Sequence, residues 1–92
     1  MELKFKDKEA ERLFIKEESK KYRAFQEQAY NRLSDLEAAN EVDDLLFPTG
    51  NHLKKLKGKR KDEWSVRINR QWRICFKVDG NIAYDIKIED YH

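Results

Sequence analysis

Two arginines in the C-terminal half of the chain stand where a β-hairpin would bring them face to face. The stretch from Trp64 to Phe76 alternates apolar and polar side chains on either side of a short polar break, which is typical of two strands joined by a turn. A three-residue turn at 69–71 keeps the apolar residues on one face and sets Arg67 opposite Arg73. Because like charges in directly opposite positions destabilise a sheet, this arginine pair is best explained as a binding site for an anion.

Basic side chains are concentrated around the predicted hairpin. Residues 1–51 hold 9 Lys and Arg against 12 Asp and Glu, whereas residues 52–92 hold 11 against 6, so the two parts carry net charges of −3 and +5. A run of lysines is typical of a solvated loop, but its position directly before the hairpin favours a surface for a polyanion. The predicted binding surface comprises Lys54, Lys55, Lys59, Arg60, Lys61, Arg70, Lys77 and Lys87.

The composition predicts one globular domain over residues 1–92. The chain is 41% charged and 39% hydrophobic, and its eleven aromatic residues exclude a disordered composition. No apolar run is long enough for a transmembrane helix or a signal peptide, and the single cysteine, Cys75, cannot form an intrachain disulfide. We therefore expect a cytoplasmic protein without a membrane partner.

The sequence shows no metal-ligand spacing. His52 and His92 are far apart, neither lies at helical spacing from another ligand, and Cys75 has no cysteine partner. We therefore expect no metal and no other cofactor, so that any chemistry comes from the side chains themselves.

The elements that must position these residues follow from hydrophobic periodicity. Residues 1–6 alternate as a short strand, and Asp7 is a suitable N-cap for a helix that begins near residue 8. Apolar residues spaced by three and four predict a longer helix over 21–39. After a loop that contains proline and glycine, residues 52–56 form a predicted second strand.

The last predicted strand follows an Asp-Gly turn at 79–80. Its alternation places four apolar side chains on one face, namely Ile82, Tyr84, Ile86 and Ile88. Keeping the apolar faces of the sheet together pairs Ile74 with Ile86. The same register sets Lys87 opposite Arg73, so that a row of three cations crosses the polar face while the other face packs on the helices.

Several groups of residues resemble the HigB branch of the RelE/ParE toxin superfamily. They are Leu56-Lys57-Gly58, Arg60, Trp64–Asn69, Gln71–Phe76, Ala83-Tyr84 and the closing Asp90-Tyr91-His92. The resemblance implies an α+β fold of the RelE type, similar to microbial ribonucleases, in which an N-terminal strand and two helices pack on a mainly antiparallel twisted sheet. It also implies a toxin that cleaves messenger RNA in the decoding site of a translating ribosome.

The resemblance further implies the partners of the chain. A HigA-type helix-turn-helix antitoxin would neutralise the toxin and repress their shared operon, so operator DNA would be contacted only through the antitoxin. The ribosome and its messenger RNA are the other expected partners. Lys59 and Arg70 depart from the family pattern, and each adds positive charge beside the expected RNA surface.

Cleavage of RNA without a metal needs a base for the 2′-hydroxyl proton, cations for the charge on the phosphate, and an acid for the leaving 5′-oxygen. The resemblance implies catalytic roles for Lys57, Arg67, Arg73 and His92, with Asp90 and Tyr91 in support. In this interpretation His92 is the base or the acid, because histidine titrates near neutral pH. Taken without the resemblance, a C-terminal histidine is more often a solvated chain end.

Two other functions fit the same sequence features. A ParE-like relative would use this fold to inhibit a protein target such as gyrase, and a basic RNA- or ribosome-binding module would have no catalytic activity. Neither the gyrase inhibitor nor the binding module needs a terminal histidine beside an arginine pair. The combination of Lys57, Arg67, Arg73 and His92 therefore favours the ribonuclease.

Overall fold

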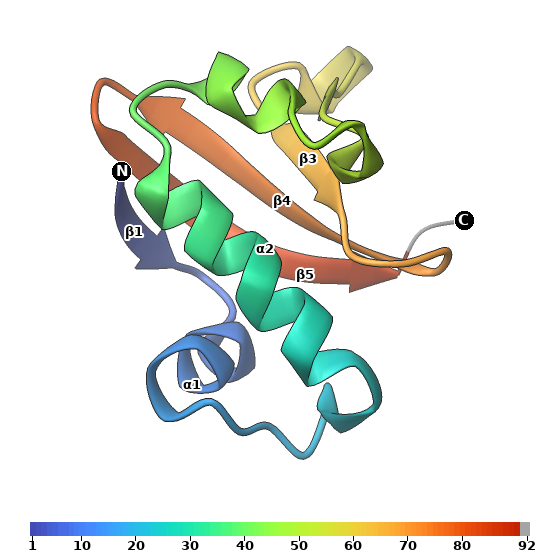
Figure 1. The fold of residues 1–92 in the computed structure, drawn as a ribbon. Coiled ribbons are helices and arrows are strands. Elements are labelled where there is room, and N and C mark those ends of the chain that lie inside the picture. Colours follow the sequence, from blue (N-terminus) through green and yellow to red (C-terminus); the bar gives the residue numbers. More distant parts are fainter. Residues whose placement is uncertain (91–92) are drawn as a thin grey trace.

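The computed structural model describes residues 1–90, which form a five-stranded sheet with helices over one face (Figure 1). The strands are β1 (Glu2–Phe5), β2 (Lys54–Lys55), β3 (Trp64–Arg67), β4 (Trp72–Asp79) and β5 (Ile82–Asp90). The helices are α1 (Lys8–Lys16) and α2 (Gln26–Ala38), with short 3-10 segments η1 (Arg23–Phe25), η2 (Val42–Leu46), η3 (Thr49–Asn51) and η4 (Gly58–Arg60). The order is β1-β5-β4-β3-β2, with β1 parallel to β5 and the other pairs antiparallel, which confirms the predicted α+β fold.

Asp7 joins the helical layer to the sheet, and it is the predicted N-cap of α1. Its Oδ1 accepts hydrogen bonds from the backbone N–H groups of Glu9 and Ala10, at 3.0 and 3.1 Å. Its Oδ2 accepts from the Tyr22 hydroxyl at 2.7 Å and from the backbone N–H of Ile88 at 3.2 Å. One carboxylate therefore holds the start of α1, the segment before α2 and the strand β5 together.

The core lies between α2 and the sheet. Leu33 and Leu36 of α2 are fully buried, as are Ile74 and Phe76 of β4. Trp72 stacks on Phe25 and meets the edge of the Tyr22 ring, with centroid distances of 5.1 and 5.9 Å. These aromatic contacts fix the start of β4 against the helical layer, and the next residue along β4 is Arg73.

The predicted register of the hairpin is confirmed. Trp64 pairs with Phe76, Val66 with Ile74, and Arg67 with Arg73. The turn is closed by Asn69, whose Oδ1 accepts hydrogen bonds from the backbone N–H groups of Gln71 and Trp72 at 2.8 and 2.9 Å. The two arginines therefore do lie opposite each other, as the alternation of the sequence requires.

The predicted register between β4 and β5 is wrong by two residues at Ile74, because the turn is one residue shorter than that register requires and β5 contains a bulge. Val78 pairs with Ala83 and Ile74 pairs with Ile88, so one extra residue of β5 lies between these pairs. The bulge occurs at Asp85, which has a left-handed φ of 51°. The β1–β5 register shifts at the same place.

The bulge changes which side chains of β5 face the core. Ala83, Ile86 and Ile88 are buried, whereas Ile82 and Tyr84 are partly exposed, so the predicted face of four apolar residues is also wrong.

The short turn and the bulge together move Lys87 away from Arg73. Lys87 pairs with Cys75, and Glu89 takes the position opposite Arg73. The expected row of three cations across the sheet is therefore replaced by Arg67, Arg73 and Glu89.

Two predicted elements are shorter than expected. The helix expected over 21–39 begins only at Gln26, because residues 23–25 form the 3-10 segment η1 and Phe25, the N-cap of α2, has a non-helical φ of −136°. The strand expected over 52–56 is reduced to β2, because His52 has a left-handed φ of 44°. Among residues 1–90, neither α-helix has the length and apolar character to cross a bilayer.

Candidate active site

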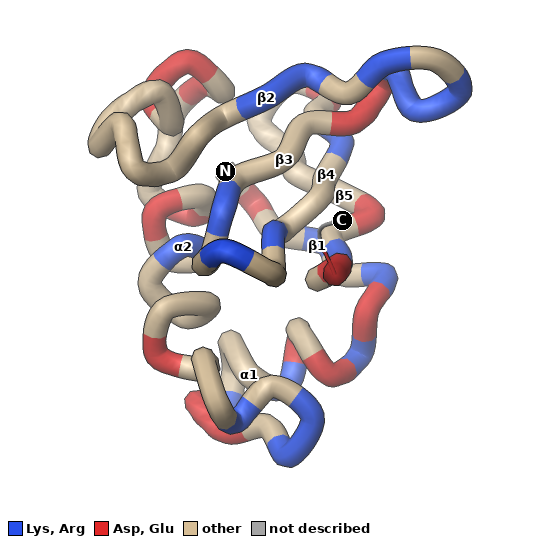
Figure 2. Tube along the Cα trace, turned by 90° about the vertical axis from the view of Figure 1, so that its right-hand side faces the viewer, with Lys and Arg blue, Asp and Glu red and all other residues tan. Residues whose placement is uncertain are grey.

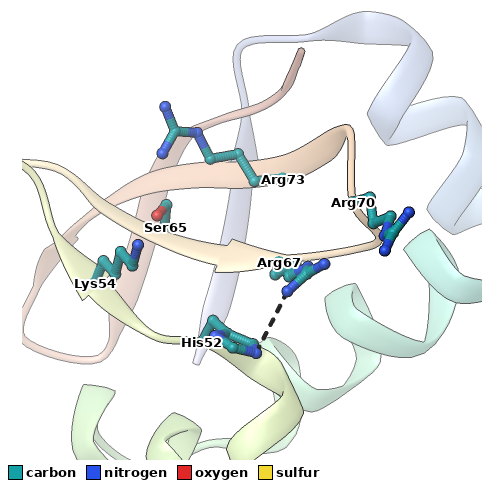
Figure 3. A pocket seen from close by; sticks show the side chains of 6 residues that line it. All are labelled: His52, Lys54, Ser65, Arg67, Arg70 and Arg73. Atoms are coloured by element: carbon teal, nitrogen blue, oxygen red, sulfur yellow. Dashed lines mark hydrogen bonds between the residues drawn. The ribbon is translucent and has the colours of Figure 1, made fainter. Parts of the chain in front are cut away.

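A pocket of about 210 Å³ opens on the polar face of the sheet, beside the hairpin (Figure 3). Its side chains come from the residue after η3, from β2, β3 and β4, and from the hairpin turn. They are His52, Lys54, Ser65, Arg67, Arg70 and Arg73, and we call this group the cationic pocket. Of the described residues that line it, none is acidic, so the pocket is suited to an anionic ligand.

The hairpin positions its arginines through the backbone. Arg67 Nε donates to the carbonyl oxygen of Asn69 at 3.0 Å, which directs the guanidinium along the turn. The carbonyl oxygen of Arg67 accepts a hydrogen bond from Arg32 Nε of α2 at 3.2 Å. The end of β3 is therefore held from both sides of the sheet, and Arg70 is carried on a turn that Asn69 already closes.

His52 belongs to this pocket, although the sequence analysis gave it no role. Its Nε2 lies 3.5 Å from Nη1 of Arg67. The preceding residue, Asn51, is buried and donates from Nδ2 to the carbonyl oxygens of Leu45 and Phe47, at 3.2 and 3.4 Å. These bonds anchor the backbone from which the imidazole projects.

The register of β2 could have identified His52 from the sequence. Lys54 pairs with Ser65 in antiparallel fashion, so continuing that register by two residues brings position 52 opposite position 67. The sequence signal for this site residue was therefore a histidine two residues before a basic strand. It was missed because His52 and Arg67 are 15 residues apart in the sequence.

Beside the cationic pocket, the polar face holds a second group of cations that are paired with carboxylates. Arg60 donates to both carboxylate oxygens of Glu63, at 2.7 and 3.0 Å, and to both of Glu89, at 2.6 and 2.9 Å. Lys87 Nζ lies 3.5 Å from Glu63 and 3.3 Å from Glu89. We call these four residues the ion-pair network.

The electrostatics of the ion-pair network follow from these contacts. Hydrogen bonds from Arg60 lower the pKa of Glu63 to about 2. Burial alone would raise the pKa of Glu89, but its bonds with Arg60 and Lys87 outweigh burial and lower the pKa. The carboxylates therefore stay ionised and keep the charge of Arg60 engaged.

Cys75 lies under the ion-pair network and is fully buried. Burial is the main cause that raises the pKa of its thiol to about 11, so the thiol is a poor nucleophile at neutral pH. One ligand atom from each of Glu63, Cys75 and Glu89 lies within 4.8 Å of the others, a spacing that could hold a metal ion. In this structure, however, Arg60 and Lys87 supply the positive charge that such an ion would bring.

The remaining predicted cations are spread over several environments. Lys77 pairs with Asp85 at 3.4 Å, and Lys55 Nζ lies 4.6 Å from the ring centroid of Trp64. The exposed lysines of the loop after β2 lie outside the cationic pocket, and they are Lys57, Lys59 and Lys61. Figure 2 shows basic residues along β2 and in this loop.

The predicted C-terminal residues are only partly described. Asp90 ends β5, pairs with Trp72, and accepts a hydrogen bond at Oδ2 from Gln71 Nε2 at 3.1 Å. The end of β5 therefore lies beside the hairpin turn. Tyr91 and His92 lie outside the described residues, so their predicted roles stay predictions.

Solved structures share this fold, and one of them is a toxin-antitoxin complex. The chain aligns with YafQ from E. coli at a TM-score of 0.64 and 10% identity, over 97% of this chain and 91% of that one. It aligns at the same TM-score and 21% identity with a chain of the YoeB-YefM toxin-antitoxin complex from Staphylococcus aureus, over 100% and 97%. At these identities the likeness shows the fold.

Sequence comparison extends the likeness to a family. A model described as the RelE-like toxin of type II toxin-antitoxin system HigB matches residues 3–92. The chain is 36% identical to Toxin HigB-1 of Vibrio cholerae over 85 residues, which cover 87% of each protein. It is also 36% identical over 62 residues to Endoribonuclease HigB of Proteus vulgaris, covering 67% of this chain and 66% of that protein. The chain therefore belongs to the HigB-like family of RelE-like toxins of type II toxin-antitoxin systems, and its partner is an antitoxin.

Proposed function

We propose that this toxin is an endoribonuclease that cleaves messenger RNA on the translating ribosome, without a metal ion, by attack of the RNA's own 2′-hydroxyl. The observation that carries the proposal is the cationic pocket, in which His52 contacts Arg67 and Arg73 stands opposite Arg67 across the hairpin. The name of the relative from Proteus vulgaris, Endoribonuclease HigB, supports the same activity.

The reaction divides into steps that side chains can perform. A base removes the proton from the 2′-hydroxyl, the oxygen attacks the adjacent phosphorus, and the 5′-oxygen leaves with a proton from an acid. The products are a 2′,3′-cyclic phosphate and a 5′-hydroxyl end. Arg67 and Arg73 stabilise the additional negative charge on the phosphate oxygens in the transition state.

Histidine supplies the proton transfer in this proposal. His52 is placed in the cationic pocket beside Arg67, and His92 is the second candidate from the sequence, supported by Asp90 and Tyr91. Two histidines would allow one to act as base and the other as acid. Lys57, on the loop after β2, would add positive charge at the margin of the RNA site.

The partners follow from the same proposal. The antitoxin is of the HigA helix-turn-helix type, and operator DNA is contacted only through it. The ribosome and messenger RNA bind on the face of the cationic pocket, with contributions from the lysines of β2 and of the loop that follows. Because translation provides the substrate, we place the toxin in the cytoplasm.

A reconstituted translation reaction tests this proposal. Message cleavage is mapped with wild type, His52→Gln, His92→Ala and a surface control, Arg12→Ala, whose side chain pairs with Glu18 on the helical layer. We expect each histidine variant to cleave at least about 100-fold more slowly and the control to match wild type. Wild-type rates for both histidine variants, or inhibition of translation with intact message, would contradict the proposal.

A further inference from the structure

A hollow lined by both acidic and apolar residues lies between the C-terminal end of α2 and η2. Its volume is about 210 Å³, and its lining comprises Asp35, Ala38, Ala39, Asp44, Leu45 and Phe47. None of these residues lines the cationic pocket. The hollow is therefore a second concave surface with the opposite charge.

Two large apolar side chains project into solvent at this surface. Leu46 is 50% exposed and Phe47 is 73% exposed, and within residues 1–90 the other large hydrophobic residue of similar exposure is Ile15 on α1, at 65%. The backbone carbonyl of Phe47 accepts a hydrogen bond from the buried Asn51 side chain. A solvent-exposed aromatic residue on an anchored backbone is typical of an anchor in a protein interface.

The charge around Phe47 indicates what kind of segment can bind there. Residues 33–53 contain no Lys or Arg, and their five acidic residues are Asp35, Glu37, Glu41, Asp43 and Asp44. Asp35 pairs with Arg32 at 3.5 Å, so the other four carry most of the available negative charge. Asp44 caps η2 by accepting from the backbone N–H groups of Asn40 and Glu41. At the C-terminal end of α2, the carbonyl oxygens of Glu37 and Ala39 accept hydrogen bonds from the N-terminal ammonium of Met1 at 2.6 and 2.8 Å, so the negative charge of this surface comes from its acidic side chains. Such a surface repels a nucleic-acid backbone and attracts Lys and Arg.

We propose that this surface, the Phe47 patch, docks the toxin's antitoxin through a segment that is both basic and apolar. The patch consists of Asp35, Glu37, Asp43, Asp44, Leu46 and Phe47. An apolar side chain of the antitoxin would enter the hollow beside Phe47, and Lys or Arg residues next to it would lie over the acidic rim. Membership of a toxin-antitoxin family provides this partner, so the inference does not depend on RNA cleavage.

Titration calorimetry with the purified antitoxin encoded beside the toxin gene tests this proposal. The variant Phe47→Ser removes the aromatic anchor, and Ile15→Ser makes the same kind of change on the exposed face of α1. We expect Phe47→Ser to weaken antitoxin binding by about tenfold or more and Ile15→Ser by less than about twofold.

A charge variant tests the acidic rim separately. Asp43 is exposed, so Asp43→Lys leaves the core intact. We expect it to weaken binding about three- to tenfold at low salt, with a smaller difference at high salt. Antitoxin affinity equal to wild type in both Phe47→Ser and Asp43→Lys would overturn the proposal.

Message cleavage by the same variants separates this proposal from a role in RNA cleavage. We expect Phe47→Ser and Asp43→Lys to retain cleavage on the ribosome, which also shows that they fold. Normal antitoxin binding combined with lost cleavage would assign the Phe47 patch to the ribosome and would overturn the proposal.

Discussion

The polar face of the sheet carries two neighbouring groups of cations that differ in their partners. Arg67 and Arg70 line the cationic pocket, and no acidic residue is found among its described lining residues. In the ion-pair network, Arg60 is held between two carboxylates, with Lys87 close to both. The β4–β5 register joins the two groups, because Glu89 lies opposite Arg73.

The contrast between the cationic pocket and the ion-pair network indicates that positive charge alone does not define a site for RNA. The carboxylates of the ion-pair network already neutralise their cations, and the pKa of Glu63, at about 2, shows how strongly they do so. The cationic pocket brings Arg67 and Arg70 together beside His52, and none of its described lining residues is acidic, so its lining is suited to an anionic ligand. We therefore assign phosphate chemistry to the pocket and a mainly structural role to the network.

The largest expected effect is the loss of cleavage in Arg73→Ala. Removing a cation that stabilises transition-state charge costs about 10²- to 10³-fold in rate. We expect the free energy of unfolding and the antitoxin affinity to stay close to wild type, since the buried Ile74 and the stacking of Trp72 on Phe25 still hold β4 against the core. Single-turnover cleavage of ribosome-bound message measures the rate, and a rate within about threefold of wild type would remove Arg73 from the pocket's chemistry.

A smaller effect is expected on stability at acid pH. The pKa of Glu63 is lower in the folded protein, at about 2, than its ordinary value of about 4.5, so the folded state binds fewer protons than the unfolded state. The stability that Glu63 contributes is therefore complete above about pH 4.5 and is lost as the pH falls toward 2. Glu89, whose pKa is also lowered, acts in the same direction.

Urea unfolding between about pH 7 and pH 3 measures this dependence. We expect Glu63→Gln to be about 1–3 kcal/mol less stable than wild type at pH 7 and to lose less further stability on acidification. If wild type and Glu63→Gln lost stability in parallel as the pH fell, the ion-pair network would not be the source of acid sensitivity.

The smallest expected effect concerns weak binding of RNA. In Glu89→Gln the network loses a charge and Arg60 loses one of its two carboxylate partners, so cations beside the pocket become available. We expect affinity for a short unstructured RNA to rise about three- to tenfold at about 50 mM salt and to fall more steeply with salt than in wild type.

The control for this prediction is Glu2→Gln, which makes the same change of charge at an exposed position on β1. Fluorescence anisotropy measures both variants. An equal rise in the two would mean that only net charge matters and that Glu89 does not mask neighbouring cations.

The sequence predicted the hairpin well because its alternation is unbroken. The pairing of Arg67 with Arg73 follows from keeping Val66 and Ile74 on one face, and the structure agrees. The pairing register of β5 could not be predicted in the same way, because a bulge at Asp85 inserts one residue without interrupting the pattern of apolar residues. Together with a β4–β5 turn one residue shorter than the predicted register requires, this bulge places Glu89 instead of Lys87 opposite Arg73.

The candidate site was predicted in part for a similar reason. The arginines were found because they are close together in a regular hairpin. His52 was not predicted as a site residue, because its position beside Arg67 depends on the pairing register of β2, a strand of only two residues. The pairing of Arg60 with Glu89 joins residues 29 positions apart, which composition and local spacing do not reveal.

In the proposed reaction, the cationic pocket promotes attack by the RNA's own 2′-hydroxyl. The most direct test uses a message with one 2′-deoxynucleotide immediately 5′ of the phosphate that wild-type toxin cleaves on the ribosome. We predict that this message stays intact while the all-ribose message is cut to a 2′,3′-cyclic phosphate end. Cleavage of the deoxy-substituted message at the same position would contradict the account.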